Sequence, residues 1–306
     1  MATPGQPRPG LDYPVDREQF MAFFPDEAAC ERYLERLSWP HGFACSACGA
    51  TGEPWRGSRR RLMCRACGRQ TTLTAGTLFQ ATRTPLLSWF AAAWLVATAD
   101  QGVSARRLAR ELELGSYETA WAMLHRFRRA MVRSGRPRLA DVVEVGTAVV
   151  PGRPAAGGAP TGALVGMAVE DRGEAPGRVR MKRVASRSSV AVAGFVTRTV
   201  EPGTMLRTEH LSAAAGELEA LGYRSAAGGR LRHLPAVRER LQGWLLGTHQ
   251  GAASHDQLDW YLDEFTFRFN RRASTHRGLL FYRLLEESVL TPPQPYRRVT
   301  AAGPPN

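Results

Sequence analysis

Four cysteines in two pairs are the residues of this sequence whose spacing most clearly carries chemistry. The pairs are Cys45-Ser-Ala-Cys48 and Cys64-Arg-Ala-Cys67, with fifteen residues between them and a glycine directly after each. Glycine permits the tight turn that lets both thiolates of a pair reach one ion. Four sulfur ligands suit tetrahedral Zn²⁺ in a closed structural site, so we predict one zinc held by all four. The alternatives are redox-active pairs or unrelated thiols, and we interpret the fifth cysteine, Cys30, as a small buried hydrophobe.

Arginines surround these cysteine pairs. The segment between the pairs reads Trp55 to Leu62, and a threonine-rich alternating segment follows the second pair. Such segments are typical of the hairpins of a zinc ribbon, which we place at residues 39–74. We expect the arginines on the exposed side of the hairpins to contact phosphate, the alternative being a solvated loop. These arginines are Arg59, Arg60, Arg61 and Arg69.

The charge distribution points to a nucleic-acid partner. The net charge is +13, and residues 55–138 hold 16 Arg or Lys against 4 Asp or Glu, a surplus of 12. Such a cluster is the electrostatic footprint of nucleic-acid binding, here double-stranded DNA. The longest apolar run, residues 89–99, is shorter than the roughly 20 residues that span a bilayer, so no membrane partner is expected. The N-terminus lacks a secretory pattern. We expect a cytoplasmic, nucleoid-associated protein whose thiols stay reduced.

Residues 83–135 have the pattern of a helix-turn-helix. A helix is expected at 85–99, a short one at 105–112, and a basic one at 117–133 that begins after the N-cap Ser116. In this geometry the first residues of the second helix enter the major groove, and basic residues contact the backbone. An ordinary helical hairpin is the alternative. The expected DNA contacts are Tyr117, Glu118, Thr119, Arg106, Arg107 and, on the open face of the last helix, His125, Arg126 and Arg129.

The remainder of the chain predicts an α/β domain at 138–290. Strands are expected at 141–145, 163–169, 178–184 and 204–208, with a helix at 188–199 and further helices from 209 to 270. This order suits a ribonuclease-H-like fold. Residues 1–16 are expected to be disordered, 17–38 helical and 291–306 a proline-rich tail. The predicted class is therefore multidomain α+β: a zinc ribbon, a helix-turn-helix, then the ribonuclease-H-like domain.

Three phrases carry a resemblance to a known family. They are Trp244 to Gly251, Tyr261 to Arg272 and Arg277 to Arg283. With the order of domains, they resemble bacterial insertion-sequence transposases that join an N-terminal zinc ribbon to a DDE-type, ribonuclease-H-like catalytic domain. The resemblance covers roughly residues 20–290. It implies binding to terminal inverted repeats and Mg²⁺-dependent strand cleavage and transfer.

The carboxylates that this chemistry requires are incomplete. Two metal ions about 3.5–4 Å apart clamp the reacting phosphodiester, and they need oxygen ligands. The resemblance places the first Asp where this chain has Gly146, and the second where it has Glu209. The third position lies among Asp263, Glu264 and Asn270, and the sequence does not decide between them.

No other residue is expected to replace the missing Asp. Glu144 points to the same face of the strand as Gly146, but the two Cα atoms are about 6.6 Å apart, farther than the metal spacing. Asp141 lies on the opposite face, and His210 and His249 are lone histidines. We therefore predict a sequence-specific DNA-binding protein derived from a transposase, domesticated or decayed, with Mg²⁺ required only if catalysis persists. The alternatives are an active transposase with an altered metal site and an unrelated zinc-ribbon transcription factor. Each of these three functions is compatible with a homo-oligomer.

Overall fold

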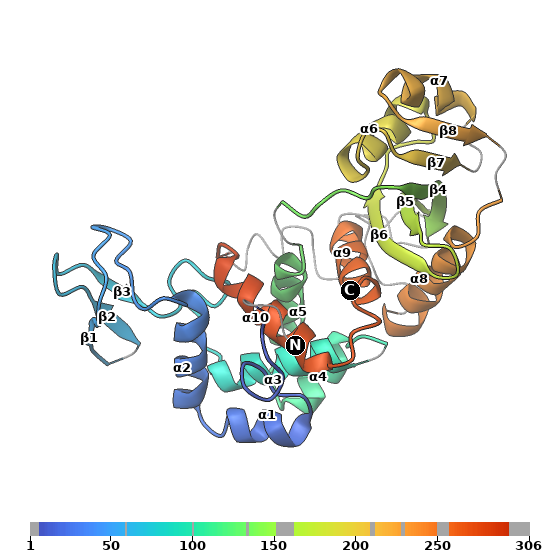
Figure 1. Cartoon of the computed structure of the whole chain (residues 1–306). Coiled ribbons are helices and arrows are strands. Elements are labelled where there is room, and N and C mark those ends of the chain that lie inside the picture. Colours follow the sequence, from blue (N-terminus) through green and yellow to red (C-terminus); the bar gives the residue numbers. More distant parts are fainter. Residues whose placement is uncertain are drawn as a thin grey trace. The chain divides into compact units, whose positions relative to one another are not determined.

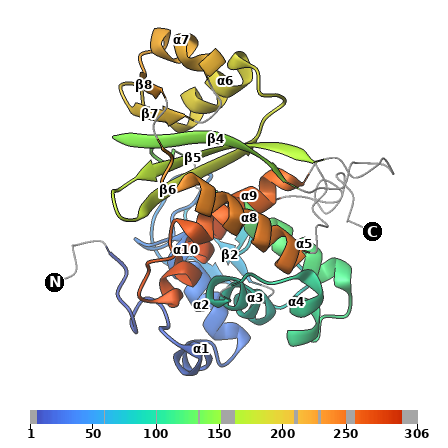
Figure 2. The same cartoon turned by 90° about the vertical axis from the view of Figure 1, so that its right-hand side faces the viewer.

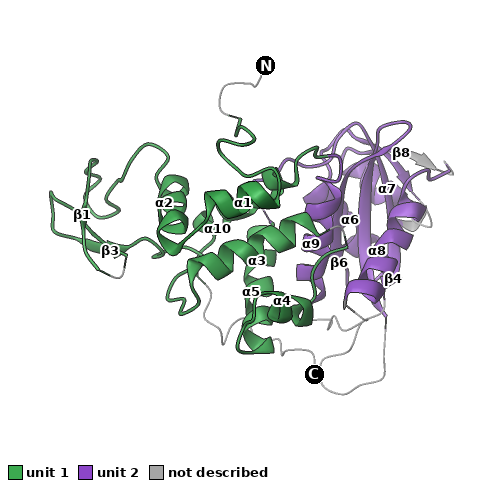
Figure 3. Ribbon diagram, turned by 90° about the horizontal axis from the view of Figure 1, so that it is seen from below, with its two compact units in different colours: residues 1–131, 274–304 green, residues 132–273, 305–306 purple. Residues whose placement is uncertain are grey.

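The computed structural model describes residues 6–58, 60–99, 101–132, 135–150, 162–208, 212–227, 230–249 and 257–293. The chain forms two compact units. Unit 1 comprises residues 1–131 and 274–304, and unit 2 comprises 132–273 with 305–306 (Figure 3). None of the described helices combines the length and the hydropathy needed to cross a membrane. Each unit is described by itself below.

A small antiparallel sheet in unit 1 carries the cysteine pairs. Its strands are β1 (Trp55–Arg56), β2 (Arg61–Met63) and β3 (Gln70–Thr72), in the order β1-β2-β3. Figure 1 labels the three strands β1, β2 and β3. Strands of two or three residues bury little surface, so a sheet of this size needs a further source of stability. The second cysteine pair lies between β2 and β3, where a metal could supply that stability.

The remainder of unit 1 is helical. It contains α1 (Arg17–Phe23), α2 (Glu27–Ser38), α3 (Leu86–Thr98), α4 (Ala105–Glu111), α5 (Tyr117–Ala130) and α10 (Arg277–Leu290). The sequence predicted one helical segment over 17–38, whereas the structure has two helices. Proline at position 25 lacks an N–H donor, and the Asp26 side chain caps α2 by accepting from the Ala29 N–H at 2.7 Å.

Aromatic rings form the core of unit 1. The ring of Phe281 on α10 lies 5.7 Å from that of Phe20, 5.7 Å from that of Trp94 and 6.1 Å from that of Phe90, centre to centre. Helix α10 therefore belongs to unit 1, whereas the sequence predicted a second domain that extends to residue 290. This face of α10 is apolar and includes the fully buried Leu284. It therefore has to pack against other apolar side chains and cannot face water.

Unit 2 is built on a five-stranded sheet. Its strands are β4 (Val142–Val150), β5 (Ala163–Asp171), β6 (Pro176–Arg183), β7 (Met205–Thr208) and β8 (Arg224–Ala227). The order is β6-β5-β4-β7-β8. Strands β4, β5 and β6 pair antiparallel, whereas β7 pairs parallel with β4, and β8 pairs parallel with β7. This mixed sheet confirms the predicted α+β class. The fifth strand, β8, was not predicted.

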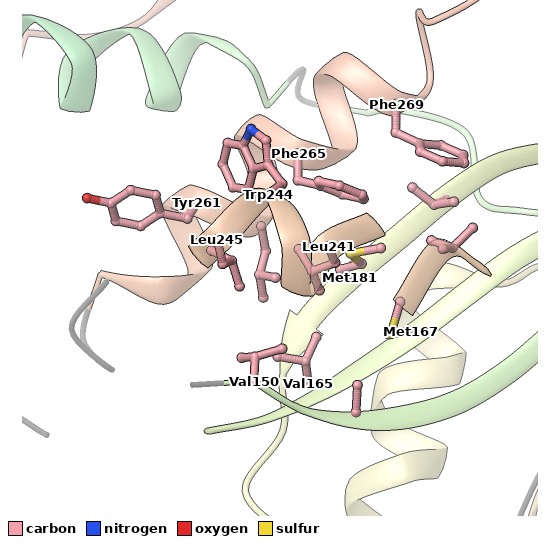
Figure 4. Close-up of a cluster of buried hydrophobic side chains, with 14 of the residues drawn as sticks. Val150, Val165, Met167, Met181, Leu241, Trp244, Leu245, Tyr261, Phe265 and Phe269 are labelled. Atoms are coloured by element: carbon pink, nitrogen blue, oxygen red, sulfur yellow. The ribbon is translucent and has the colours of Figure 1, made fainter. Parts of the chain in front are cut away.

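Helices cover both faces of this sheet. On one face lie α6 (Ser189–Thr199) and α7 (Ser212–Ala220), and on the other lie α8 (Leu234–His249) and α9 (Leu258–Phe269) (Figure 2). Figure 4 shows Trp244 and Phe265 packed over Val165 and Met181 on the second face. Side chains alternate along a strand, so residues 144, 146 and 148 of β4 share the face that α8 covers.

Candidate functional site

The two cysteine pairs form matching turns. In the first, the N–H of Gly49 donates to the carbonyl of Cys45 at 2.8 Å, and in the second the N–H of Gly68 donates to Cys64 at 3.0 Å. Both glycines have a positive φ, +74° and +71°. A side chain at either position would be strained in this conformation, which explains why glycine follows each pair.

The four sulfur atoms converge on one point. The Sγ atoms of Cys45 and Cys67 are 3.7 Å apart, as are those of Cys48 and Cys64. All four lie within 4.8 Å of one another. Sulfurs about 2.3 Å from a tetrahedral zinc would be about 3.8 Å apart, so the site fits the ion. The N–H of Ala47 donates to Cys45 Sγ at 3.4 Å, which favours the thiolate that zinc requires. The predicted structural Zn²⁺ site is confirmed.

Arg60 has a structural role that the sequence analysis did not foresee. Its guanidinium binds the carboxylates of Glu31, at 2.7 Å, and of Glu27 on α2. Glu27 in turn accepts from the N–H groups of Leu86, at 2.7 Å, and Leu87, at 2.9 Å, at the start of α3. Arg60 thus joins the ribbon to two helices of unit 1, and it was expected to contact DNA.

Of the other ribbon arginines expected to contact phosphate, the two that the structure describes are open to solvent. Arg61 and Arg69 are exposed, on β2 and directly before β3. Arg59 lies outside the described residues. Arg61 and Arg69 therefore remain candidates for phosphate contacts, because their guanidinium groups face solvent.

The predicted helix-turn-helix consists of α4 and α5, each capped by a serine. Ser104 accepts from the Arg107 N–H at 3.2 Å, and Ser116 accepts from the Thr119 N–H at 3.1 Å. Tyr117 and Glu118 are exposed at the start of α5, and Thr119 is half-buried. Arg106 and Arg107 on α4 are also exposed, and Arg107 pairs with Glu111 at 2.6 Å. The use of this helix pair in DNA binding remains a prediction.

The later part of α5 faces inward more than predicted. His125 is 3% exposed, and its ring lies 4.0 Å from that of Trp121. The prediction that His125 lies on the open face is corrected. Arg126 and Arg129 are half-buried, and Arg128 is 2% exposed. Alternating Arg and apolar residues make the inner face of this helix hard to identify from sequence.

Gly146 occupies the strand position at which the resemblance expects the first catalytic Asp. It lies on β4, where Val145 pairs with Thr208, the last residue of β7. Glu209 follows Thr208 and lies outside the described residues, as does His210. The parallel pairing of β4 with β7 brings Thr208, the residue before position 209, to the strand next to Gly146.

The space beside Gly146 is already filled. A Cβ atom at this position would lie 3.3 Å and 3.4 Å from the two methyl carbons of Leu234, and 3.9 Å from Nη2 of Arg238. Leu234 is fully buried at the start of α8. A side chain at residue 146 would therefore have its Cβ in tight contact with Leu234 and close to the guanidinium group of Arg238.

Glu144 is used by the fold. Its buried carboxylate accepts from the backbone N–H groups of Arg232, His233 and Leu234 at 2.6, 2.9 and 2.7 Å. These donors lie at the N-terminus of α8, where helix N–H groups lack internal partners. Glu144 therefore cannot replace the missing Asp without releasing this helix.

The residues of α9 are also engaged in the fold. Asn270 accepts from the Val179 N–H at 2.7 Å and donates to the Val179 carbonyl at 3.1 Å. Val179 lies on the edge strand β6, two strand spacings or about 10 Å from β4. Glu264 is buried and accepts from Arg268 Nε at 3.0 Å.

Asp263 on α9 has a shifted pKa. Burial raises the pKa of Asp263 to about 6, although Arg136, 3.8 Å away, acts in the opposite direction. Over the described ranges, only the four cysteines form a group of three or more metal-type ligands.

A buried charged cluster beside Glu144 was missed. Asp171 pairs with Arg207 of β7, and His233 Nε2 lies 3.2 Å from Asp171 Oδ1 and 3.1 Å from the Gly173 carbonyl. Burial acts to raise the pKa of Asp171, but hydrogen bonds from Gly173 and His233 and the charge of Arg207 hold it below its usual value. Asp171, Arg207 and His233 are distant from one another in sequence. The one signal that could have pointed to this cluster is the register of β4 and β7, which sets Arg207 opposite Glu144.

Comparisons with known proteins agree with this architecture. Residues 25–70 match the family model of the transposase zinc-ribbon domain, and residues 138–270 match that of the ISXO2-like transposase domain. An uncharacterized protein in transposable element ISH50 of Halobacterium salinarum is 30% identical over 125 residues, which are 40% of this chain. The match spans 41% of the length of that relative. This chain therefore combines a transposase zinc-ribbon domain, at residues 25–70, with an ISXO2-like, ribonuclease-H-like transposase domain, at residues 138–270.

Proposed function

We propose that this protein binds specific sites in double-stranded DNA and neither cuts nor joins the strands. The observation that carries this proposal is Gly146, which supplies no carboxylate and whose Cβ position is in tight contact with Leu234 and lies 3.9 Å from Nη2 of Arg238. The chain would be a domesticated or decayed descendant of a transposase. Its sites would resemble the inverted repeats of the ancestral element.

The DNA-binding half of the proposal rests on charge and exposure. Residues 55–138 carry 16 basic against 4 acidic residues. Exposed arginines lie on the ribbon, at Arg61 and Arg69, and on α4, at Arg106. Phosphate contacts by such residues supply most of the affinity for a duplex and make it depend on salt. A nucleoid-associated protein that works as a homo-oligomer on paired half-sites fits this arrangement.

The inactive half of the proposal rests on geometry. Productive catalytic sites tolerate errors of about 0.5 Å. At position 146 a ligand is missing and its space is filled by Leu234, while Glu144 is held at the start of α8. The residues present therefore do not fit a two-metal site.

The retained carboxylate of Glu209 favours the second candidate, an active transposase with an altered metal site. The test is nicking of a supercoiled plasmid that carries the bound sequence, with Mg²⁺ or Mn²⁺. We expect no nicking by the parent protein and unchanged DNA affinity in a Glu209→Ala variant. Nicking by the parent that disappears in Glu209→Ala would overturn inactivity.

A gain of function would identify the cause of the loss. We expect nicking only when Gly146→Asp and Glu209→Asp are combined with Leu234→Ala, which opens the space beside residue 146. The same pair of acidic substitutions with Leu234 retained is the matched control, and it should stay inactive because the new carboxylate has no room.

A further inference from the structure

A hollow of about 230 Å³ in unit 1 is not explained by any role described so far. It lies between the turn at residues 81–84 and the first half of α5, with Trp89 of α3 beside it. Thr119, Met123 and Arg126 supply its wall from α5. The hollow therefore adjoins the residues expected to enter a DNA groove.

Arg126 is a cation whose charge no described residue compensates. Its guanidinium lies 5.8 Å from the centre of the Trp89 ring, and its buried Nε has no hydrogen-bond partner. Burial lowers the pKa of Arg126, with no neighbouring charge contributing. Placing a guanidinium in such surroundings is unfavourable unless a ligand completes it, so an anion is the expected partner.

The turn opposite Arg126 is rigidly built. Thr82 Oγ1 accepts from Trp89 Nε1 at 2.9 Å and from the Thr84 N–H at 3.1 Å, and it donates to the Thr84 carbonyl at 3.2 Å. Ala81 has a φ of +56°, a strained value for a residue with a side chain. These bonds fix the backbone on either side of Arg83, which is exposed and lines the same hollow. Two guanidinium groups thus line one preorganised space.

One carboxylate also lines the hollow. Glu118 stands eight residues before Arg126 on α5, which is about 12 Å along the helix axis. The acidic group is therefore at the groove-facing end of the helix, and Arg126 is at the other. Carboxylates accept hydrogen bonds from cytosine amino groups in the major groove, whereas arginines bind phosphate.

We propose that this hollow binds one backbone phosphate of a DNA duplex, with Arg83 and Arg126 as its donors. The proposal rests on the DNA binding proposed above and adds the site that would fix the register of α5 on the duplex. A free phosphate ion shares this chemistry, and the experiment below separates the two sources.

The test compares the full-length protein with Arg126→Met, which keeps the apolar stem over Trp89 and removes the charge. Arg32→Met is the matched control, because Arg32 is exposed on α2 and gives the same change in net charge. Affinity for one duplex is measured over a range of salt concentrations. We expect Arg126→Met to bind about tenfold more weakly, with a salt slope shallower by about 0.9, the value for one phosphate. Arg32→Met should match the parent.

Further arms keep the proposal falsifiable. Arg126→Lys should restore most of the slope, and thermal unfolding should show that all variants are folded. A duplex with one neutral methylphosphonate at the contacted position should weaken binding by the parent but not by Arg126→Met. Arg126→Met that binds like Arg32→Met would overturn the phosphate site alone.

Two further outcomes are distinguishable. A parent protein that binds no duplex would overturn the proposed function and this site together. Inorganic phosphate that stabilises the DNA-free parent against heat but not Arg126→Met, with equal DNA affinity in both proteins, would assign the hollow to a free anion and overturn the DNA contact.

Discussion

The carboxylate of Glu144 on β4 accepts a hydrogen bond from the backbone N–H of Leu234 at 2.7 Å. The same carboxylate accepts from Arg232 and His233, so one buried side chain binds three donors at the start of α8. The positive end of the helix dipole favours this charge. Leu234, positioned in this way, fills the space beside Gly146. The Glu144 carboxylate thus helps to hold Leu234 against Gly146.

Glu144→Gln should lower the free energy of unfolding without changing the fold. An amide has one acceptor oxygen instead of two and places an N–H₂ group against backbone donors. Leaving buried donors unsatisfied costs about 1–3 kcal/mol. Urea unfolding would measure this loss. Glu174→Gln, at an exposed position, is the control and should change stability by less than about 0.5 kcal/mol. Equal stability of both variants would contradict the assigned role.

Removal of a zinc ligand should unfold the ribbon. Cys64→Ser leaves three sulfur ligands and should abolish the zinc that metal analysis of the parent is expected to show at one ion per chain. Because the binding energy of such a site is folding energy, DNA affinity should fall as well. Cys30→Ala removes a buried thiol outside the site and should retain one zinc. Freshly purified parent protein without zinc would sink this prediction.

The ribbon arginines should separate into two classes. Arg61→Gln combined with Arg69→Gln should weaken duplex binding and make the salt slope shallower by about 1.8, the value for two phosphates. Arg60→Gln should instead reduce the free energy of unfolding by about 1 kcal/mol, because it breaks the ion pairs to Glu27 and Glu31. The comparison should use the full chain, because a fragment ending at residue 138 would lack Phe281 of the unit 1 core. If Arg60→Gln made the salt slope of duplex binding shallower than the double variant does, this division would be contradicted.

Local patterns predicted much of this structure. The paired cysteines led to the metal site, and the alternating strands and turn residues led to the order of elements in unit 2. Strand β8 escaped prediction because Arg224-Ser-Ala-Ala lacks the branched and aromatic residues that mark strands. Helix α10 was assigned to the wrong side of the unit boundary, because nothing local shows that Phe281 packs against Phe20 and Trp94.

The candidate catalytic site could be judged from sequence only in part. The absence of a carboxylate at Gly146 is visible in the sequence. The filling of its space by Leu234 is not, because that contact joins residues far apart in the chain. The same is true of Glu144, whose three donors lie about 90 residues away. Burial of His125 beside Trp121 depends likewise on packing that helical periodicity did not resolve.

The stability of the protein should depend on the protonation of Asp263. Burial raises the pKa of this carboxyl group to about 6, above the usual value of about 3.9. The folded state therefore holds the proton more tightly than the unfolded state, and stability should fall as the pH rises from about 4 to about 6. Asp263→Asn should remove this loss and be more stable than the parent at pH 7, by on the order of 1–2 kcal/mol. Urea unfolding at several pH values checks this, and the same pH dependence in parent and variant would contradict it.

Substitutions at Gly146 should reveal how much room remains for a side chain at this position. Gly146→Ala places a methyl group 3.3 Å from Leu234 and should cost about 1 kcal/mol as mild overpacking. Gly146→Asp should cost more, about 2–4 kcal/mol, because it also buries a carboxylate against the Leu234 methyl groups, a cost that the nearby Arg238 only partly offsets. Leu234→Ala should recover part of the second cost, so the double variant should be more stable than the sum of the single effects predicts. Urea unfolding of the parent, Gly146→Asp, Leu234→Ala and the double variant gives the coupling energy between residues 146 and 234. Additive effects, or a stable Gly146→Asp, would mean that the site can still accept a catalytic carboxylate.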